Sequence, residues 1–128
     1  MADVHGHLPR SPAGVWRALR WSLLGLRAAW LHESSFRLEV YLLAILGPLG
    51  WYLGETGIER ALLIGSCLLV LAMELMNSSM EAVIERFGPE RHELSGRAKD
   101  MGSAAVFVLM MNVVLVWALL LLPRVSLF

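Results

Sequence analysis

The sequence predicts an all-α integral membrane protein, in which an amphipathic surface helix precedes three transmembrane helices within one membrane domain, residues 1–128. Apolar residues make up 57% of the chain and charged residues only 17%, against about 45–50% and about 25% in typical soluble domains. A soluble chain this short could not bury so many apolar side chains, because small domains expose a large surface for their volume. The charged residues are also confined to a few segments, which leaves long uncharged stretches between them.

The surface helix is expected over residues 13–31. At about 100° per residue, the apolar side chains and Ser22 share one face, with arginines to one side of it. Three tryptophans, Trp16, Trp21 and Trp30, lie in the same segment. Arginine and tryptophan together are typical of a helix that lies in the membrane interface, so this reading is favoured over a solvated helix packed on its own bundle.

Three apolar segments follow, and each is a candidate to cross the bilayer. Residues 40–54 carry no charge, residues 61–84 are charged only at Glu74 and Glu81, and residues 101–123 carry no charge. A helix needs about 20 apolar residues to span a membrane, with about 17 as the lower end, so the first segment must extend backward. The expected spans are residues 36–55, 58–85 and 97–122, with residues 86–96 as a loop.

The basic residues predict the orientation. The N-terminal segment up to and including Arg37 and the region 86–100 hold nine of the 11 Lys and Arg residues, and the other two are Arg60 and Arg124. By the positive-inside rule, the N-terminus and the region 86–100 are therefore expected in the cytoplasm. The formal net charge is zero, so the chain has no excess of positive charge that would favour a nucleic-acid partner.

An acidic stripe runs along the expected second span. Glu74, Asn77, Glu81 and Glu85 follow one another at helical spacing and share one face of an α-helix. A charged carboxylate at the bilayer centre costs about 2.5–3.5 kcal/mol, so a lone helix would gain little by exposing this face to lipid. The stripe is therefore expected near the interface, against another helix or on a polar cavity.

Three interpretations of the acidic stripe remain open: helix–helix hydrogen bonds, a proton or ion path, and a metal-supported active site with a general base and carboxylates for Mg²⁺. Two acids and an amide on one face exceed what helix packing needs, which favours a function. Cations beside acids suit a polyphosphate bound through a metal. Other polar residues are expected at the same membrane level: Glu33, Arg37, Glu39, Glu90, His92, Glu93, Arg97, Lys99 and Asp100. The sequence contains no P-loop and no G-x-G-x-x-G motif.

The motifs of the chain resemble the prokaryotic diacylglycerol kinase family. The run E-x-x-N-S-x-x-E-A-V begins at Glu74, G-R-A-K-D-M-G-S-A-A begins at Gly96, and G-L-R-A-A-W begins at Gly25. The resemblance covers about residues 14–122. It implies a multi-pass homotrimer in the bacterial inner membrane, with active sites between neighbouring chains on the cytoplasmic side. It also implies transfer of the ATP γ-phosphate to 1,2-diacylglycerol, which gives phosphatidic acid.

The resemblance also implies roles for individual residues. Glu74 is similar to the catalytic base, which Asn77 would orient, while Glu33 and Glu81 are similar to the Mg²⁺ ligands. The positions similar to the ATP-binding residues are Trp21, Glu33, Glu81, Glu90, His92, Lys99 and Asp100. The positions similar to the lipid-binding residues are Trp30, Ser35, Arg37, Glu39, Glu74 and Ser103.

Two positions depart from the family pattern. Gly14 stands where some members have an arginine near the phosphates, a role that Arg17 or Arg10 could take, and Glu85 stands where the family often has Asp. A related branch consists of undecaprenol kinases, which is the alternative enzyme, although residues 97–103 resemble the diacylglycerol branch more closely. The alternative outside enzymes is a small helical assembly that uses the acidic stripe for protons or for a partner.

Overall fold

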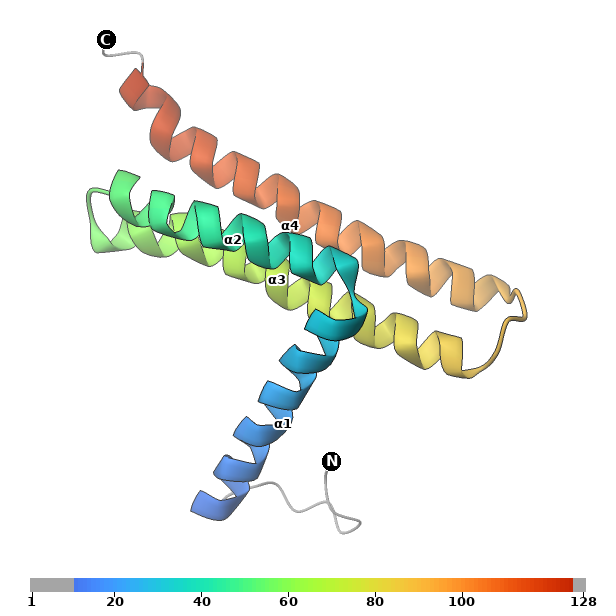
Figure 1. The fold of residues 1–128 in the computed structure, drawn as a ribbon. Coiled ribbons are helices and arrows are strands. Elements are labelled where there is room, and N and C mark those ends of the chain that lie inside the picture. The colour runs from blue at the N-terminus through green and yellow to red at the C-terminus, as the bar shows by residue number, and fades with distance from the viewer. Residues whose placement is uncertain (1–10, 126–128) are drawn as a thin grey trace.

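The computed structural model describes residues 11–125, and within this range it contains four α-helices and no strand. Helices α2, α3 and α4 run side by side as a long bundle, and α1 projects from it at the α1–α2 corner (Figure 1). All three bundle helices are long and apolar enough to cross a membrane, which confirms the predicted fold class. The bounds are α1 Pro12–His32, α2 Ser34–Leu53, α3 Gly57–Arg86 and α4 Glu93–Val125.

The bundle is tied together where the three long helices meet around Leu63, whose side chain is fully buried. Gly50 lets α2 approach closely, since a Cβ there would lie 3.2 Å from the Leu63 Cβ. From α4, the Trp117 indole N–H donates to the Leu63 carbonyl at 3.1 Å. Most other large apolar side chains point outward, as expected for a bundle whose apolar surface faces lipid.

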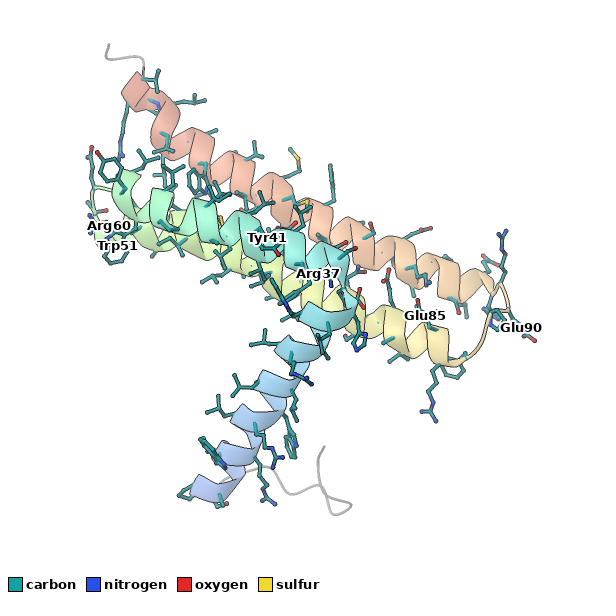
Figure 2. All side chains as sticks on the ribbon, in the orientation of Figure 1. Arg37, Tyr41, Trp51, Arg60, Glu85 and Glu90 are labelled. Carbon is teal, nitrogen blue, oxygen red and sulfur yellow. The ribbon has the colours of Figure 1, made fainter. Side chains whose placement is uncertain are left out.

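The α1–α2 corner is held by a small set of side chains. Glu33 leaves the helical conformation, with φ −114° and ψ 108°. Arg37 reaches back from α2, and its Nη1 donates to the Trp30 carbonyl at 2.8 Å, where the end of α1 leaves carbonyls without helical partners. The Trp30 and Tyr41 rings meet edge to face with centroids 5.8 Å apart. Figure 2 shows Arg37 and Tyr41 at this corner, which directs α1 away from the bundle.

The loop between α3 and α4 is shorter than the expected 86–96, because α4 already begins at Glu93 rather than at residue 97. The His92 Nδ1 accepts a hydrogen bond from the Leu94 N–H at 3.1 Å, so a free donor of the first helical turn is satisfied. Glu93 places a negative charge in that same turn, where the helix dipole favours it. Four more residues therefore join the helix.

The turn between α2 and α3 lies at the opposite end of the bundle, and α2 stops at Leu53 rather than at residue 55. The Thr56 hydroxyl accepts from the Glu59 N–H at 3.2 Å and caps α3. The Arg60 guanidinium lies over the Trp51 ring, 4.8 Å from its centroid, and donates to the Trp51 and Gly54 carbonyls. Figure 2 shows Arg60 and Trp51 together at this end.

Arg124 joins the end of α4 to this turn. Its Nη1 donates to the Leu53 carbonyl at 2.7 Å, and its Nη2 lies 2.7 Å from the Glu59 Oε2. The Glu55 carboxylate lies farther away, at 3.7 Å from the Arg124 Nε. We call Arg124, Leu53 and Glu59 the outer clamp, because they join all three long helices at the end opposite the α1–α2 corner.

Replacing Arg124 with Gln is expected to lower the midpoint of thermal unfolding by a few degrees. The shorter, neutral side chain leaves the Glu59 carboxylate without its cation and frees the end of α4 from the Leu53 carbonyl. Thermal unfolding in detergent, followed by circular dichroism, measures the change. The control is Arg91→Gln, in the exposed α3–α4 loop. Equal midpoints for the two variants would show that the outer clamp does not stabilise the bundle.

Candidate functional site

Glu74 is a buried carboxylate on the helix at the centre of the bundle. It is 6% exposed, although a charged side chain in an apolar setting normally costs folding free energy. It belongs to the face of α3 that packs against the other helices, whose buried members are Leu63, Ser66, Cys67, Val70, Glu74 and Ser78. The innermost acid of the acidic stripe therefore points into the bundle rather than into lipid.

Three other carboxylates act on Glu74 electrostatically. Those of Glu39 on α2, Glu81 on α3 and Glu33 at the α1–α2 corner all lie within electrostatic range of it. Like charges near a buried acid destabilise a fold, so a role in stabilising the bundle does not explain why these carboxylates lie near one another. Acidic groups gathered in this way are typical of sites that bind cations or move protons.

A pocket opens between α1 and α3, and both predicted metal ligands line it. Glu33 and Glu81 are half-buried there, and the more exposed Glu85 lines it as well. In Figure 2, Glu85 lies on the part of α3 that extends beyond the α1–α2 corner. The polar residues that complete the lining are Ser22, His32, Ser78 and Ser79.

The donor set of this pocket fits Mg²⁺. Carboxylate oxygens are the ligands that Mg²⁺ prefers, and protein sites commonly supply one or two of them while water and substrate phosphates supply the rest. Among residues 11–125, no group of three or more His, Cys, Asp or Glu side chains is arranged to hold a metal by itself. Glu33 and Glu81 therefore suit an ion that arrives with a phosphate-bearing substrate, rather than an ion enclosed by protein.

Asn77 packs against α4 instead of facing the α1–α3 pocket. A Cβ added to Gly102 would lie 3.4 Å from the Asn77 Cγ and would overlap its Oδ1. That oxygen is buried and has no hydrogen-bond partner among the described residues. The acidic stripe is thus divided: Glu74 points into the bundle, Asn77 meets α4, and the two outer glutamates line the pocket with α1.

The residues predicted to bind ATP do not all gather around this pocket within one chain. Lys99 is half-buried on α4, whereas Asp100, Glu90 and His92 are exposed and Trp21 lies on α1 with 41% exposure. None of these five lines the α1–α3 pocket. Figure 2 places Glu90 in the loop at the far end of the α3–α4 hairpin. Within the chain, His92 serves to cap α4.

The residues predicted to bind lipid fall into three places. Trp30 and Arg37 form the α1–α2 corner, where the Arg37 guanidinium is engaged by the carbonyls of α1. Glu39 lines an apolar pocket between α2, α3 and α4, together with leucines of α2, Cys67, Val70, Met110 and Val113. Ser35 and Ser103 are exposed. Glu39 therefore lines an apolar pocket and also acts electrostatically on Glu74.

Gly14, where the family pattern differs, lies in the first turn of α1. Its N–H donates to the Ser11 hydroxyl at 3.1 Å, so this position begins the helix. Arg17, one of the two arginines expected to compensate, is exposed on α1. Arg10, the other, lies outside the described residues.

His32 and Ser79 line the α1–α3 pocket, and the sequence pattern assigns neither of them a role. Helical spacing places Ser22, which also lines this pocket, on the apolar face of α1, and a polar residue on such a face is a usable signal for a cavity. His32 had no such signal, because its position depends on where α1 ends. The lining of this pocket follows from how two distant helices meet.

The comparisons with known proteins agree with the motifs. The family model for prokaryotic diacylglycerol kinase matches residues 20–121. The chain is 55% identical to the diacylglycerol kinase of Haemophilus influenzae over 98 residues, which are 77% of this chain and 83% of that protein. It is 47% identical over 107 residues to that of Escherichia coli and 45% identical over 108 residues to that of Pseudomonas aeruginosa, covering 84% of this chain and 88% of each relative.

Family and fold agree with each other. A chain with three helices able to span a bilayer, matched over most of its length by a membrane kinase family, is a multi-pass membrane protein. The motif positions lie on α1, on the acidic stripe of α3 and on the first turns of α4. From its sequence motifs, its helices and these relatives, the chain belongs to the prokaryotic diacylglycerol kinase family.

Proposed function

We propose that the chain transfers the γ-phosphate of ATP to 1,2-diacylglycerol, which yields phosphatidic acid at the cytoplasmic face of the bacterial inner membrane. The family and its relatives named diacylglycerol kinase support this assignment. The observation that carries it is the buried Glu74 carboxylate on a membrane-spanning helix. A lipid alcohol is presented at membrane depth, so a base that acts on it must be there too.

Glu74 is the proposed general base, and Asn77 is proposed to orient it. A carboxylate within hydrogen-bond reach of the lipid hydroxyl can accept its proton as the oxygen attacks the γ-phosphorus and the bond from that phosphorus to ADP breaks, which releases ADP. The apolar pocket that Glu39 lines offers hydrocarbon surroundings close to the carboxylates. Trp30, Ser35, Arg37 and Ser103 are proposed to line the path of the lipid around the α1–α2 corner and α4.

Glu33 and Glu81 are the proposed holders of Mg²⁺. Their carboxylates line one pocket, Glu33 from the α1–α2 corner and Glu81 from α3, and water and phosphate oxygens would supply the other ligands of the ion. When bound, Mg²⁺ supplies neutralisation of the charge that develops on the transferred phosphoryl group. The two glutamates position the nucleotide, and the burial of Glu74 keeps its carboxylate away from bulk water.

The site is proposed to be shared between neighbouring chains of a homotrimer. The α1–α3 pocket is lined by three carboxylates and by no lysine or arginine. A triphosphate requires cationic donors, which kinases supply from lysine or arginine. Lys99 lies outside the pocket of its own chain. A neighbouring chain is therefore the proposed source of the α4 residues Lys99 and Asp100 and of Trp21, Glu90 and His92.

The assignment predicts that the purified protein in mixed micelles converts diacylglycerol to phosphatidic acid with Mg-ATP. The sharpest form of the assay offers diacylglycerol and undecaprenol together with γ-labelled ATP and separates the lipid products. The labelled product is expected to be phosphatidic acid, and no label is expected when EDTA removes the metal.

Two results would contradict the proposal. Label found only in undecaprenyl phosphate would place the chain in the related branch. Proton flux across vesicles without ATP consumption, and without any lipid product, would favour a non-enzymatic assembly built on the acidic stripe.

A further inference from the structure

Gly102 lies where α4 comes closest to the acidic stripe. The space that a Cβ would occupy there is filled by the Asn77 carboxamide, with its Cγ at 3.4 Å and its Oδ1 overlapping. Gly102 has no unusual backbone conformation, since Gly88 is the glycine with positive φ among the described residues. The requirement for glycine at this position is therefore one of space.

The contact also determines how the Asn77 carboxamide is turned. The hydrogen that replaces a Cβ on Gly102 points at the Asn77 Oδ1, which is the geometry of the weak Cα–H···O contacts found between packed helices. That oxygen is buried and receives no other hydrogen bond among residues 11–125. Because the two ends of a carboxamide point in different directions, the NH₂ end does not point at Gly102.

We propose that Gly102 is a positioning residue for phosphoryl transfer. By lacking a Cβ, it seats the Asn77 oxygen against α4 and leaves the amide N–H groups as the donors that Asn77 presents to the site beside Glu74. A carboxylate base and phosphoryl oxygens both accept hydrogen bonds, so a donor is the useful end of the amide there. The inference rests on the proposed roles of Glu74 and Asn77.

The test begins with Gly102→Ala. The added methyl group displaces the Asn77 carboxamide, and a displacement of about 1 Å near the reacting groups can lower a rate by about 100-fold. We expect kcat to fall by about 10- to 100-fold while the KM values for ATP and diacylglycerol stay within about twofold, because Asn77 acts on the reaction step. The matched control is Gly65→Ala on α3, where a Cβ meets nothing within 4 Å; its kcat is expected to match wild type.

A double-mutant cycle with Asn77→Ala tests whether Gly102 acts through Asn77. The single Gly102→Ala variant is expected to unfold at a lower temperature than wild type, because the core there is overpacked. Asn77→Ala removes the atoms that the methyl group meets, so Asn77→Ala with Gly102→Ala is expected to recover most of that loss. If Gly102→Ala alone does not fold, recovery of a folded protein in the double variant gives the same answer.

The outcomes separate this inference from the proposed function. If wild type makes no phosphatidic acid, the proposed function fails, and the positioning role fails with it. If wild type is active and Gly102→Ala keeps its kcat, only the positioning role is overturned. Additive losses of stability in the cycle, or equal losses in kcat for Gly102→Ala and Gly65→Ala, would also overturn it. A fall in kcat at unchanged KM, together with recovery in the double variant, supports it.

Discussion

Glu74→Gln is expected to abolish phosphoryl transfer while the protein becomes no less stable. Gln has nearly the same size as Glu but cannot accept the proton of the lipid hydroxyl, and a general base contributes about 10²- to 10⁴-fold to a rate. The wild-type side chain is buried and lies among three other carboxylates. A neutral amide removes the desolvation and repulsion that this charge costs, so the midpoint of thermal unfolding is expected to stay level or to rise.

Glu74→Gln is informative because its activity is expected to fall while its thermal stability stays level or rises. Replacing a residue that only supports packing would lower activity and stability together. Replacing a catalytic base that lies among like charges lowers activity alone. The measurements are kcat with Mg-ATP and diacylglycerol, thermal unfolding, and the oligomer size in detergent. Glu55→Gln is the control, because it makes the same change on an exposed carboxylate at the opposite end of the bundle. Wild-type turnover in Glu74→Gln would show that another group accepts the proton.

The helices of this fold could be predicted because lipid leaves the backbone few choices. In a bilayer, every N–H and C=O group must be bonded within its own segment or within a closed barrel, so a long uncharged run such as residues 101–123 is expected to be helical. The ends of the helices depend on single contacts. The start of α4 at Glu93 depends on His92, and the break at Glu33 is held by Arg37. A hydropathy profile predicts neither of these contacts.

The candidate site could be predicted only in part. Helical spacing places Glu74, Asn77, Glu81 and Glu85 on one face, but it does not say which of them faces the bundle and which faces α1. That division depends on the direction in which α1 leaves the α1–α2 corner. The small residues around Gly102, which are Ala98, Ser103, Ala104 and Ala105, permit a close helix contact but do not identify the partner side chain. The roles of these residues in catalysis stay predictions.

The outer clamp could not be anticipated at all. Arg124 and the Leu53 carbonyl are 71 positions apart. A single basic residue near the end of an apolar segment is common in transmembrane helices, so it does not indicate a specific partner. Local patterns report on which face a residue lies, whereas contacts between helices depend on how complete helices pack. The structure therefore adds most where two or three helices share one group of atoms, as at the outer clamp and at Asn77.

Glu81→Gln is expected to weaken the binding of the divalent cation and to lower activity at ordinary Mg²⁺ concentrations. Removing a group that only supports a metal ligand already costs about 10- to 100-fold in affinity or activity, so loss of a ligand should cost at least about tenfold. Mn²⁺ prefers the same oxygen donors and is paramagnetic, so its binding in the presence of ATP can be followed directly by electron paramagnetic resonance. Activity measured against Mg²⁺ concentration gives the second readout.

Glu33→Gln completes the argument, because both glutamates line one pocket and are proposed to hold one ion. If they do, the two single variants weaken Mn²⁺ binding alike, and the double variant, which lacks both proposed ligands, binds no Mn²⁺ above the level of ATP alone. High Mg²⁺ is expected to restore part of the kcat of each single variant, since mass action offsets weaker binding. Glu93→Gln, exposed in the first turn of α4, serves as the control carboxylate. Unchanged Mn²⁺ binding in both single variants would place the ion elsewhere, and the α1–α3 pocket would then lose its assigned role.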